Sequence, residues 1–264
     1  MHAKSLITLL TDFGTADAFV ASMKGVILSV NPKTTIVDIT HEISPHGIRH
    51  AAFVLESTYR HFPKNTIHVV VVDPGVGGSR KPLLVVYPNA CFIGPDNGVF
   101  SYLYKERVKH KIYSLNTLQY KIKKYSPTFD GRDLFAPAAA YLSKGISPAK
   151  LGKRVKDYVT FPIPEPYWLK DDSLQGQVIH ADRFGNLITN ITTQDLKPWL
   201  DTGKTPTITL KGQTIKGLKQ FYAQANPGEL CALINSDDHL EIFCNQASVR
   251  SLLNATEDEL VEVR

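Results

Sequence analysis

Apolar residues in the first half of the chain alternate between short continuous runs and longer stretches with helical spacing. The continuous runs are typical of strands buried in a parallel sheet, and they cover Leu6–Leu10, Thr35–Ile39 and Thr66–Val72, with shorter strands at Leu83–Val86 and Cys91–Ile93. Apolar residues three and four positions apart predict helices over 19–30, 47–62 and 132–142. Because strands and helices alternate, the pattern predicts an α/β domain with a mainly parallel sheet.

The second half of the chain has a different pattern. Helical spacing nearly vanishes, and short apolar runs separated by polar turns predict strands at Gln175–His180, Leu187–Ile191, Thr207–Leu210, Leu230–Asn235 and Leu240–Cys244. The proline-rich segment Phe161–Pro166 leaves no room for a helix and is the best candidate linker. We therefore predict an α/β domain over residues 1–164 and a small all-β, barrel-like domain over residues 165–264.

Composition narrows the class of protein. Hydrophobic residues make up 43% of the 264 residues, which is enough for a real core, and the net charge of +5 is mild. The one dense basic stretch, Lys105–Lys124, also contains tyrosines, yet a solvated loop is the simpler interpretation, so we predict no nucleic-acid partner. Three cysteines without metal-ligand spacing predict buried free thiols, and the absence of a membrane-spanning or signal-like stretch predicts a cytoplasmic protein without a membrane partner.

Short segments rich in aspartate and glycine follow the apolar runs. They are Thr11–Gly14, Asp73–Gly77, Pro95–Gly98, Thr128–Asp133 and Asp182–Asn186. In α/β folds the loops after strand ends line the ligand crevice. Glycine lets backbone approach a ligand closely, and carboxylates bind hydroxyls, amines or cations. Together the segments predict a site for a polar, cationic, sugar-bearing molecule.

The loop from Asp73 to Arg80 holds a carboxylate and a guanidinium seven positions apart around a glycine-rich turn. It lacks the Gly-Lys-Ser/Thr ending of a phosphate-binding P-loop. The two charges are either a functional pair or a salt bridge that fastens a surface loop. Because exposed salt bridges contribute only about 0.2–1 kcal/mol, we favour a functional pair.

The other aspartates also have structural interpretations. Asp17 directly precedes the first predicted helix and is the natural N-cap, which leaves Asp12 as the candidate for ligand contact. In the segment before the third helix, Asp133 suits the helix N-terminus, and Asp130 is the better catalytic or ligand candidate.

In the second half, Asp182, Phe184 and Asn186 lie between two predicted strands. A β-turn explains the polar residues, but not Phe184, which is typical of a stacking surface. Asn235–Asp238 has the composition of a hairpin turn. The nine histidines show no metal-binding spacing, and we predict no metal and no cofactor.

The ordered set of motifs resembles the S-adenosyl-L-methionine (SAM) hydrolase family, the SAM hydroxide adenosyltransferases, which are related to the fluorinase and chlorinase. The resemblance runs from about Ser5 to about Leu253, and it is carried by TDFGTAD, DITHEI, VVDPGVG, GPDNG, TF-x-GRD, D-x-FGN and a late Asn-Ser turn followed by Asn245-Gln246. It implies an N-terminal α/β domain, a C-terminal β-barrel domain and a homotrimer in which SAM lies at the subunit interface. The implied reaction is attack of water or hydroxide on C5′ of SAM, which gives adenosine and L-methionine.

The resemblance also implies roles for individual residues. Asp73, Arg80 and Asp130 would surround the attacking water as the catalytic set, and Asp12 would hold the ribose hydroxyls. The remaining substrate-binding residues would be Asp17, Asn97, Asp182, Phe184, Asn186, Ser236 and Gln246.

The chain departs from the family pattern at Asp130, where the family usually has histidine, and at His46, where a bulkier apolar or aromatic residue is more usual. Two close acids resist being charged together, so the alternative is a SAM- or adenosine-binding protein with little or no turnover. A halogenase fits less well, because Val76 and Gly131 stand where the halide site uses small hydroxyl side chains.

Overall fold

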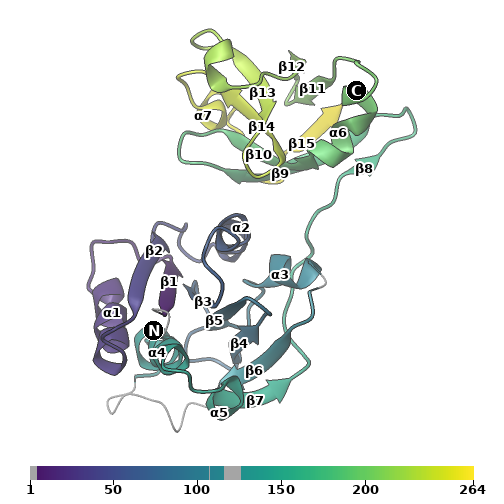
Figure 1. Ribbon diagram of the computed structural model, residues 1–264. Coiled ribbons are helices and arrows are strands. Elements are labelled where there is room, and N and C mark those ends of the chain that lie inside the picture. The colour runs from purple at the N-terminus through teal and green to yellow at the C-terminus, as the bar shows by residue number, and fades with distance from the viewer. Residues whose placement is uncertain (1–4, 107, 116–125) are drawn as a thin grey trace. The chain divides into compact units, whose positions relative to one another are not determined.

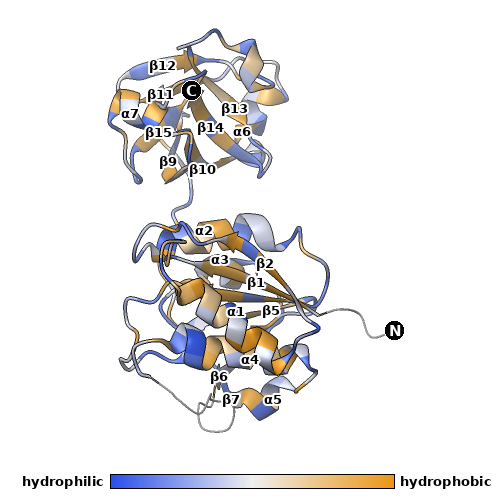
Figure 2. Cartoon of the chain, turned by 90° about the vertical axis from the view of Figure 1, so that its left-hand side faces the viewer, coloured by the Kyte–Doolittle hydropathy of each residue, from blue (hydrophilic) through white to orange (hydrophobic). Residues whose placement is uncertain are grey.

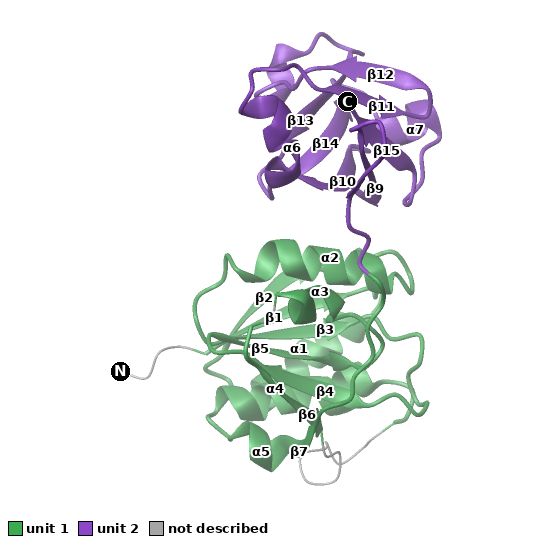
Figure 3. Ribbon diagram, turned by 90° about the vertical axis from the view of Figure 1, so that its right-hand side faces the viewer, with its two compact units in different colours: residues 1–162 green, residues 163–264 purple. Residues whose placement is uncertain are grey.

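The computed structural model describes residues 5–106, 108–115 and 126–264. The chain folds into two compact units, unit 1 over residues 1–162 and unit 2 over residues 163–264 (Figure 3). The division lies in the proline-rich segment that the composition marks as a linker. Residues 107 and 116–124 of the basic Lys105–Lys124 stretch lie outside the described residues.

Unit 1 is built on a seven-stranded sheet with the strand order β2-β1-β3-β5-β4-β6-β7. β1, β2, β3 and β5 pair in parallel, and β4, β6 and β7 extend one edge with antiparallel pairs. The strands are β1 (Leu6–Thr11), β2 (Thr35–Thr40), β3 (Thr66–Val71), β4 (Pro82–Val86), β5 (Ala90–Pro95), β6 (Lys111–Leu115) and β7 (Gly152–Val155). The predicted mainly parallel sheet is confirmed, while β6 and β7 were not expected from the apolar pattern.

Helices cover both faces of this sheet (Figures 1 and 2). One core cluster joins α1 (Phe19–Val30) and α4 (Ala136–Ser143) to Ile67, Val69 and Val71 of β3. A second joins α2 (Ile48–Tyr59) and α3 (Ser101–Lys105) to the alternate residues Val70 and Val72. Because both faces of β3 are buried, its sequence is a continuous apolar run rather than an alternating one. A short α5 (Pro148–Leu151) precedes β7.

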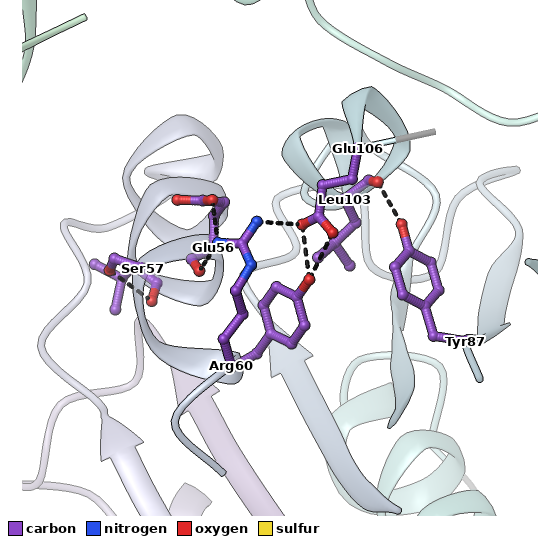
Figure 4. A network of polar contacts seen from close by, with 8 residues as sticks. Glu56, Ser57, Arg60, Tyr87, Leu103 and Glu106 are labelled. Atoms are coloured by element: carbon purple, nitrogen blue, oxygen red, sulfur yellow. Dashed lines mark hydrogen bonds and ion pairs between the residues drawn. The ribbon is translucent and has the colours of Figure 1, made fainter. Parts of the chain in front are cut away.

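A polar network fastens α2 to α3 near the N-terminal edge of the parallel strands (Figure 4). Arg60 donates to Glu56 at 2.6 Å and to Glu106 at 2.9 Å. The Tyr59 hydroxyl also donates to Glu106, at 2.7 Å. Because α2 runs antiparallel to the strands, its last residues lie near the amino ends of the parallel strands. The network therefore stabilises the end of the sheet opposite the strands' carboxyl ends.

Unit 2 is an antiparallel, barrel-like sheet with the strand order β12-β11-β15-β9-β10-β14-β13 and β8 paired to β9. The strands are β8 (Tyr167–Trp168), β9 (Leu174–Ala181), β10 (Leu187–Thr192), β11 (Thr207–Leu210), β12 (Gln213–Lys216), β13 (Leu230–Ile234), β14 (His239–Cys244) and β15 (Leu260–Val263). The Lys219 N–H donates to the Ala232 carbonyl at 2.8 Å, which brings the segment after β12 beside β13 and nearly closes the barrel. The predicted all-β domain is confirmed.

Unit 2 also contains short helices that the missing helical periodicity did not predict. They are α6 (Thr193–Leu200), α7 (Val249–Leu253) and the 3-10 turn η2 (Tyr222–Gln224). At α6 the Asp195 carboxylate accepts the N–H and the hydroxyl of Thr192, a local capping arrangement that the Thr-x-x-Asp spacing could have indicated.

All three cysteines are free, with Cys231 and Cys244 buried and Cys91 half-buried. Within the described residues no helix is long and apolar enough to cross a membrane. The same residues contain no group of three histidine, cysteine or acidic side chains arranged to hold a metal ion.

Candidate active site

Asp12 directly follows β1, and its loop is anchored to the segment after β2. The Asp12 carboxylate accepts the His46 N–H at 2.9 Å, and His46 adopts a left-handed backbone conformation with φ of 64°. Behind it, the Thr11 hydroxyl lies 2.8 Å from Nδ1 of His41, and the Gly14 N–H donates to the His41 carbonyl at 2.7 Å. These contacts fix the direction of the Asp12 side chain.

The loop after β3 joins Asp73 to Arg80. Nε of Arg80 donates to both oxygens of Asp73, at 3.0 and 2.9 Å. Nη2 of Arg80 lies 2.5 Å from Asp73 and 2.5 Å from Asp130. The Arg80, Asp73 and Asp130 side chains are only 12%, 5% and 4% exposed, so this is a buried cluster and not a surface salt bridge.

The two acids of this cluster act on the pKa of Arg80. Burial alone would lower the pKa of Arg80, but hydrogen bonds and charge attraction from Asp73 and Asp130 raise it above its ordinary value. A guanidinium with a raised pKa stays charged at any physiological pH. The two carboxylates therefore share one permanent positive charge.

Asp130 reaches Arg80 because of an unusual helix start. The residues after it, Gly131–Phe135, form the π-helical turn η1, which continues into α4, where the sequence predicted a regular helix over 132–142. Asp130 makes no side-chain cap on this turn. A Cβ on Gly131 would lie 3.1 Å from the Phe129 ring and 3.3 Å from the Met23 sulfur, so the close packing here favours glycine. Turns of this kind often occur at functional sites.

Asp133 lies in the first turn of η1, at the helix start where the sequence predicted it, but its carboxylate contacts the preceding loop and its neighbour. Its carboxylate is fully buried, accepts the Ser126 N–H at 2.7 Å and pairs with Arg132 at 2.6 Å. It holds the start of the loop that carries Asp130.

A cavity of about 330 Å³ in unit 1 is lined by Asp12, Asp73 and Asp130 together with aromatic rings. The rings of Phe13, Phe19 and Phe129 lie 5.3–5.7 Å from one another, and His46 and Val76 complete the wall. The structure thus joins four predicted site residues, since Arg80 pairs with two of the cavity's carboxylates. An aromatic wall beside fixed carboxylates suits a ligand with both a ring and a positive charge.

Arg80 adjoins the cavity through its two carboxylate partners, and two other predicted residues of unit 1 lie outside the set that lines it. Asp17 is exposed, and the prediction that it caps α1 is wrong, because Ala18 occupies the N-cap without a side-chain hydrogen bond. Asn97 donates to the Val72 carbonyl at 2.8 Å and accepts the Val99 N–H at 3.2 Å, contacts that fasten the turn after β5 to the end of β3.

Unit 2 contains a larger cavity of about 660 Å³ beside the turn between β9 and β10. The Asp182 carboxylate accepts the N–H groups of Phe184 and Asn186, both at 2.9 Å, and the Asn186 side-chain amide at 3.1 Å. Phe184 is left 77% exposed on this turn. The turn is held so tightly to α7 that a Cβ on Gly185, where φ is 82°, would lie 2.0 Å from the Ser248 hydroxyl.

The predicted residues Asp182, Phe184, Asn186 and Gln246 all line the unit 2 cavity, whereas Ser236 lies exposed in the turn between β13 and β14, outside the lining set. Sequence reasoning missed Tyr222 and Phe243, which also line it and whose rings meet at 5.0 Å. Phe243 sits in an apolar strand and Tyr222 in an irregular segment, so neither had a local signal that pointed to a site.

Comparisons with known proteins agree for both units. Residues 7–152 match the family model described as the SAM hydroxide adenosyltransferase N-terminal domain, and residues 176–262 match that of the C-terminal domain.

Similar proteins cover nearly the whole chain. A Methanocaldococcus jannaschii protein named (R)-S-adenosyl-L-methionine hydrolase is 33% identical over 274 residues, which is 98% of this chain and 95% of that protein. A Nocardia brasiliensis protein named fluorinase is 28% identical and covers 99% of this chain and 97% of its own length. The solved structure of an uncharacterised conserved protein from Thermotoga maritima superposes with a TM-score of 0.90 at 33% identity, and covers 97% of this chain and 99% of that one.

Proposed function

The chain belongs to the SAM hydroxide adenosyltransferase family, and on that premise we propose that it hydrolyses SAM to adenosine and L-methionine. The resemblance carried by the sequence motifs is confirmed by these matches. In the proposed reaction a water oxygen bonds to C5′, the bond from C5′ to the sulfonium sulfur breaks, and the sulfur keeps the electron pair. The water proton passes to a carboxylate of the site and from there to the solvent.

The observation that carries this proposal is the buried cluster of Asp73, Arg80 and Asp130 at the unit 1 cavity. A carboxylate beside the attacking water orients it and accepts its proton, a role that contributes about 10²–10⁴-fold in rate when the group is well placed. Arg80 holds both carboxylates in place, because its donors lie on both of them. Either acid can therefore act on the water without a change of side-chain position.

The leaving group makes few further demands. Methionine leaves as a neutral thioether, so no general acid is needed, and the site has to align water with the C–S bond and remove part of its hydration. The aromatic wall of Phe13, Phe19 and Phe129 supports such a partly dry cavity. Carboxylates around it favour a cationic substrate over its neutral products.

We assign Asp12 to the ribose hydroxyls, as the resemblance implies. One Asp12 oxygen accepts the His46 N–H, and a carboxylate retains further lone pairs for two hydroxyl donors. We assign Phe184, Asn186 and Gln246 of unit 2 to the adenine, and Asp182 and Ser236 of unit 2 with Asp17 of unit 1 to the methionine end. Asn97 of unit 1 is a further proposed substrate contact. The proposed homotrimer is checked by light scattering, which should give three times the chain mass of 29.3 kDa.

The experiment uses purified protein, SAM and water enriched in ¹⁸O. We expect many turnovers to adenosine and methionine by chromatography, with ¹⁸O in the 5′-hydroxyl of adenosine by mass spectrometry. Added fluoride or chloride should leave the products unchanged. Stoichiometric bound nucleoside without turnover would instead support the SAM- or adenosine-binding alternative.

Variants test the cluster directly. Asp73→Asn should lower kcat by about 10²–10⁴-fold, and Asp130→His, which restores the usual family residue, should preserve or raise it. Asp157→Asn is the matched control, because Asp157 lies in unit 1 with its side chain 80% exposed. Wild-type rates in Asp73→Asn would remove the assignment of the water site.

A further inference from the structure

Glu241 is a buried acid in unit 2 that neither the motifs nor the proposed reaction uses. It lies on β14, where Leu240, Ile242 and Cys244 face the core of the barrel. The alternate residue Phe243 faces the other side and packs against Ala225, Cys231 and Leu233. Glu241 shares that second face and is only 3% exposed. A carboxylate at such a depth is costly unless it is hydrogen-bonded.

Both oxygens of Glu241 have partners. The Tyr222 hydroxyl donates to Oε1 at 2.9 Å, and Nδ2 of Asn235 donates to Oε2 at 3.3 Å. The orientation of the Asn235 amide follows from its other contacts, since its Oδ1 accepts the N–H groups of Asp237 and His239, both at 3.0 Å. Asn235 must therefore present its amino group to Glu241.

These two partners belong to different parts of the binding surface. Tyr222 lines the 660 Å³ cavity and remains 46% exposed, so packing alone does not fix its ring. Asn235 begins the turn that carries Ser236, a predicted substrate contact. One buried carboxylate thus joins the aromatic wall of the cavity to the β13–β14 turn.

The charge of Glu241 has an energetic cost. Burial raises its pKa, hydrogen bonds from Tyr222 and Asn235 oppose that shift, and the nearby charges of Asp182 and Asp237 reinforce it. Even a buried ion pair can often be replaced by apolar residues of similar volume without loss of stability, and a single buried acid carries the same kind of desolvation cost. Stability is consequently a weak reason for an acid at this position.

We propose that Glu241 is a positioning residue for substrate, which holds the Tyr222 hydroxyl and the Asn235 amide so that the cavity wall and the neighbouring turn keep one arrangement. This inference rests on the proposed function. It goes beyond it by giving a role to a residue that touches neither the cavity nor the reacting atoms.

The test compares Glu241→Gln, Glu241→Leu, Tyr222→Phe and the double variant Glu241→Gln/Tyr222→Phe in the full chain. A glutamine has only one acceptor oxygen for two donors, and Tyr222→Phe keeps the ring but removes its donor. We expect each single variant to raise KM for SAM about tenfold, with kcat close to wild type. In the double variant the single glutamine oxygen has only the Asn235 amide to accept, so one donor contact is lost, as in each single variant, and KM should match theirs.

Two further variants separate positioning from stability. Glu241→Leu should keep or raise the melting temperature and still raise KM. Glu262→Gln, on β15 of the same unit and paired to the exposed Arg264 side chain, should change neither the melting temperature nor KM. A lower melting temperature with unchanged KM in Glu241→Gln would show a merely structural role and overturn the inference.

The same series is measured for adenosine binding by calorimetry, where the dissociation constants should rise in parallel with KM. A wild-type protein that turns over SAM, with unchanged KM in Glu241→Gln and Tyr222→Phe, overturns this inference alone. A wild-type protein with no turnover overturns the proposed reaction, and the adenosine affinities then decide the role of Glu241. If the wild type neither turns over SAM nor binds adenosine, both proposals fail.

Discussion

The two units build their cavities in opposite ways. In unit 1 the cluster joins residues that are distant along the chain, since Arg80 and Asp130 are 50 positions apart. In unit 2 the Asp182 carboxylate is satisfied locally, since each hydrogen bond to it from the described residues comes from a residue no more than 4 positions away. The first arrangement depends on the fold of the whole unit, and the second on a single turn.

The difference follows from sheet topology. Parallel strands deliver the loops after β1 and β3 to one edge of the sheet, where their charges meet and become buried. An antiparallel barrel exposes its turns, and a turn satisfies its polar groups locally, as Asp182 does, while its aromatic residue points outward. We therefore expect substitutions in unit 1 to change stability and activity together, and those in the unit 2 turn to change binding alone.

The largest expected effect is on the buried cluster. Arg80→Met leaves Asp73 and Asp130 buried without their cation, and we expect the free energy of unfolding to fall by about 3–5 kcal/mol. Chemical denaturation followed by circular dichroism measures it. Lys219→Met is the matched control in unit 2, where it breaks a pair with side chains 32% and 35% exposed, and the stability should stay close to wild type. Equal losses of unfolding free energy in Arg80→Met and Lys219→Met would contradict this difference between the two units.

The next effect is the response of unit 1 to acid. His68 on β3 is fully buried, its Nδ1 lies 2.8 Å from the Thr8 hydroxyl, and burial lowers its pKa from 6.5 to about 4. In the unfolded chain the His68 imidazole is therefore protonated below about pH 6.5, whereas in the folded protein it stays neutral until the pH falls to about 4. Stability present above pH 6.5 is lost as the pH falls through this window, by on the order of 3 kcal/mol.

The acid response of unit 1 can be compared with that of a variant without His68 and with that of unit 2. His68→Phe, which keeps an aromatic ring stacked on Phe92, should flatten the loss of unfolding free energy between pH 6.5 and 4. Glu241 in unit 2 has a raised pKa, so its contribution changes in the opposite sense and favours the folded state as the pH falls. Both tryptophans lie in unit 2, so their fluorescence follows that unit while circular dichroism follows the whole chain. Identical pH slopes in wild type and His68→Phe would refute the prediction.

The smallest expected change in stability belongs to the unit 2 turn. Phe184→Ala removes a ring that is 77% exposed, so the free energy of unfolding should change by less than about 0.5 kcal/mol. KM for SAM should nevertheless rise, because that ring lines the cavity. Phe221→Ala, at a residue 54% exposed and outside the lining set, is the control and should leave KM unchanged. A similar rise of KM in both variants would argue against a stacking role for Phe184.

Much of this organisation could be predicted from the sequence. Continuous apolar runs predicted β1 and β3, because strands buried on both faces need no polar alternation. The run at β2 was predicted in the same way, although β2 is an edge strand and only partly buried. Asp12 and Asp73 were recognisable as candidates because each follows a predicted parallel strand, and Asp130 because it lies in the charged segment before a predicted helix. The strands β6 and β7 were not predictable in this way, since their residues are partly exposed and mixed in character.

The sequence by itself determined the composition of the site, the two-part organisation and the family, because these depend on residue types in order along the chain. Only the tertiary structure decided that Arg80 holds both acids and that Tyr222 hydrogen-bonds a buried Glu241. The physical reason is the same in each case. A hydrogen bond or ion pair depends on distance in space, and residues far apart in sequence come within reach only after the whole unit has packed.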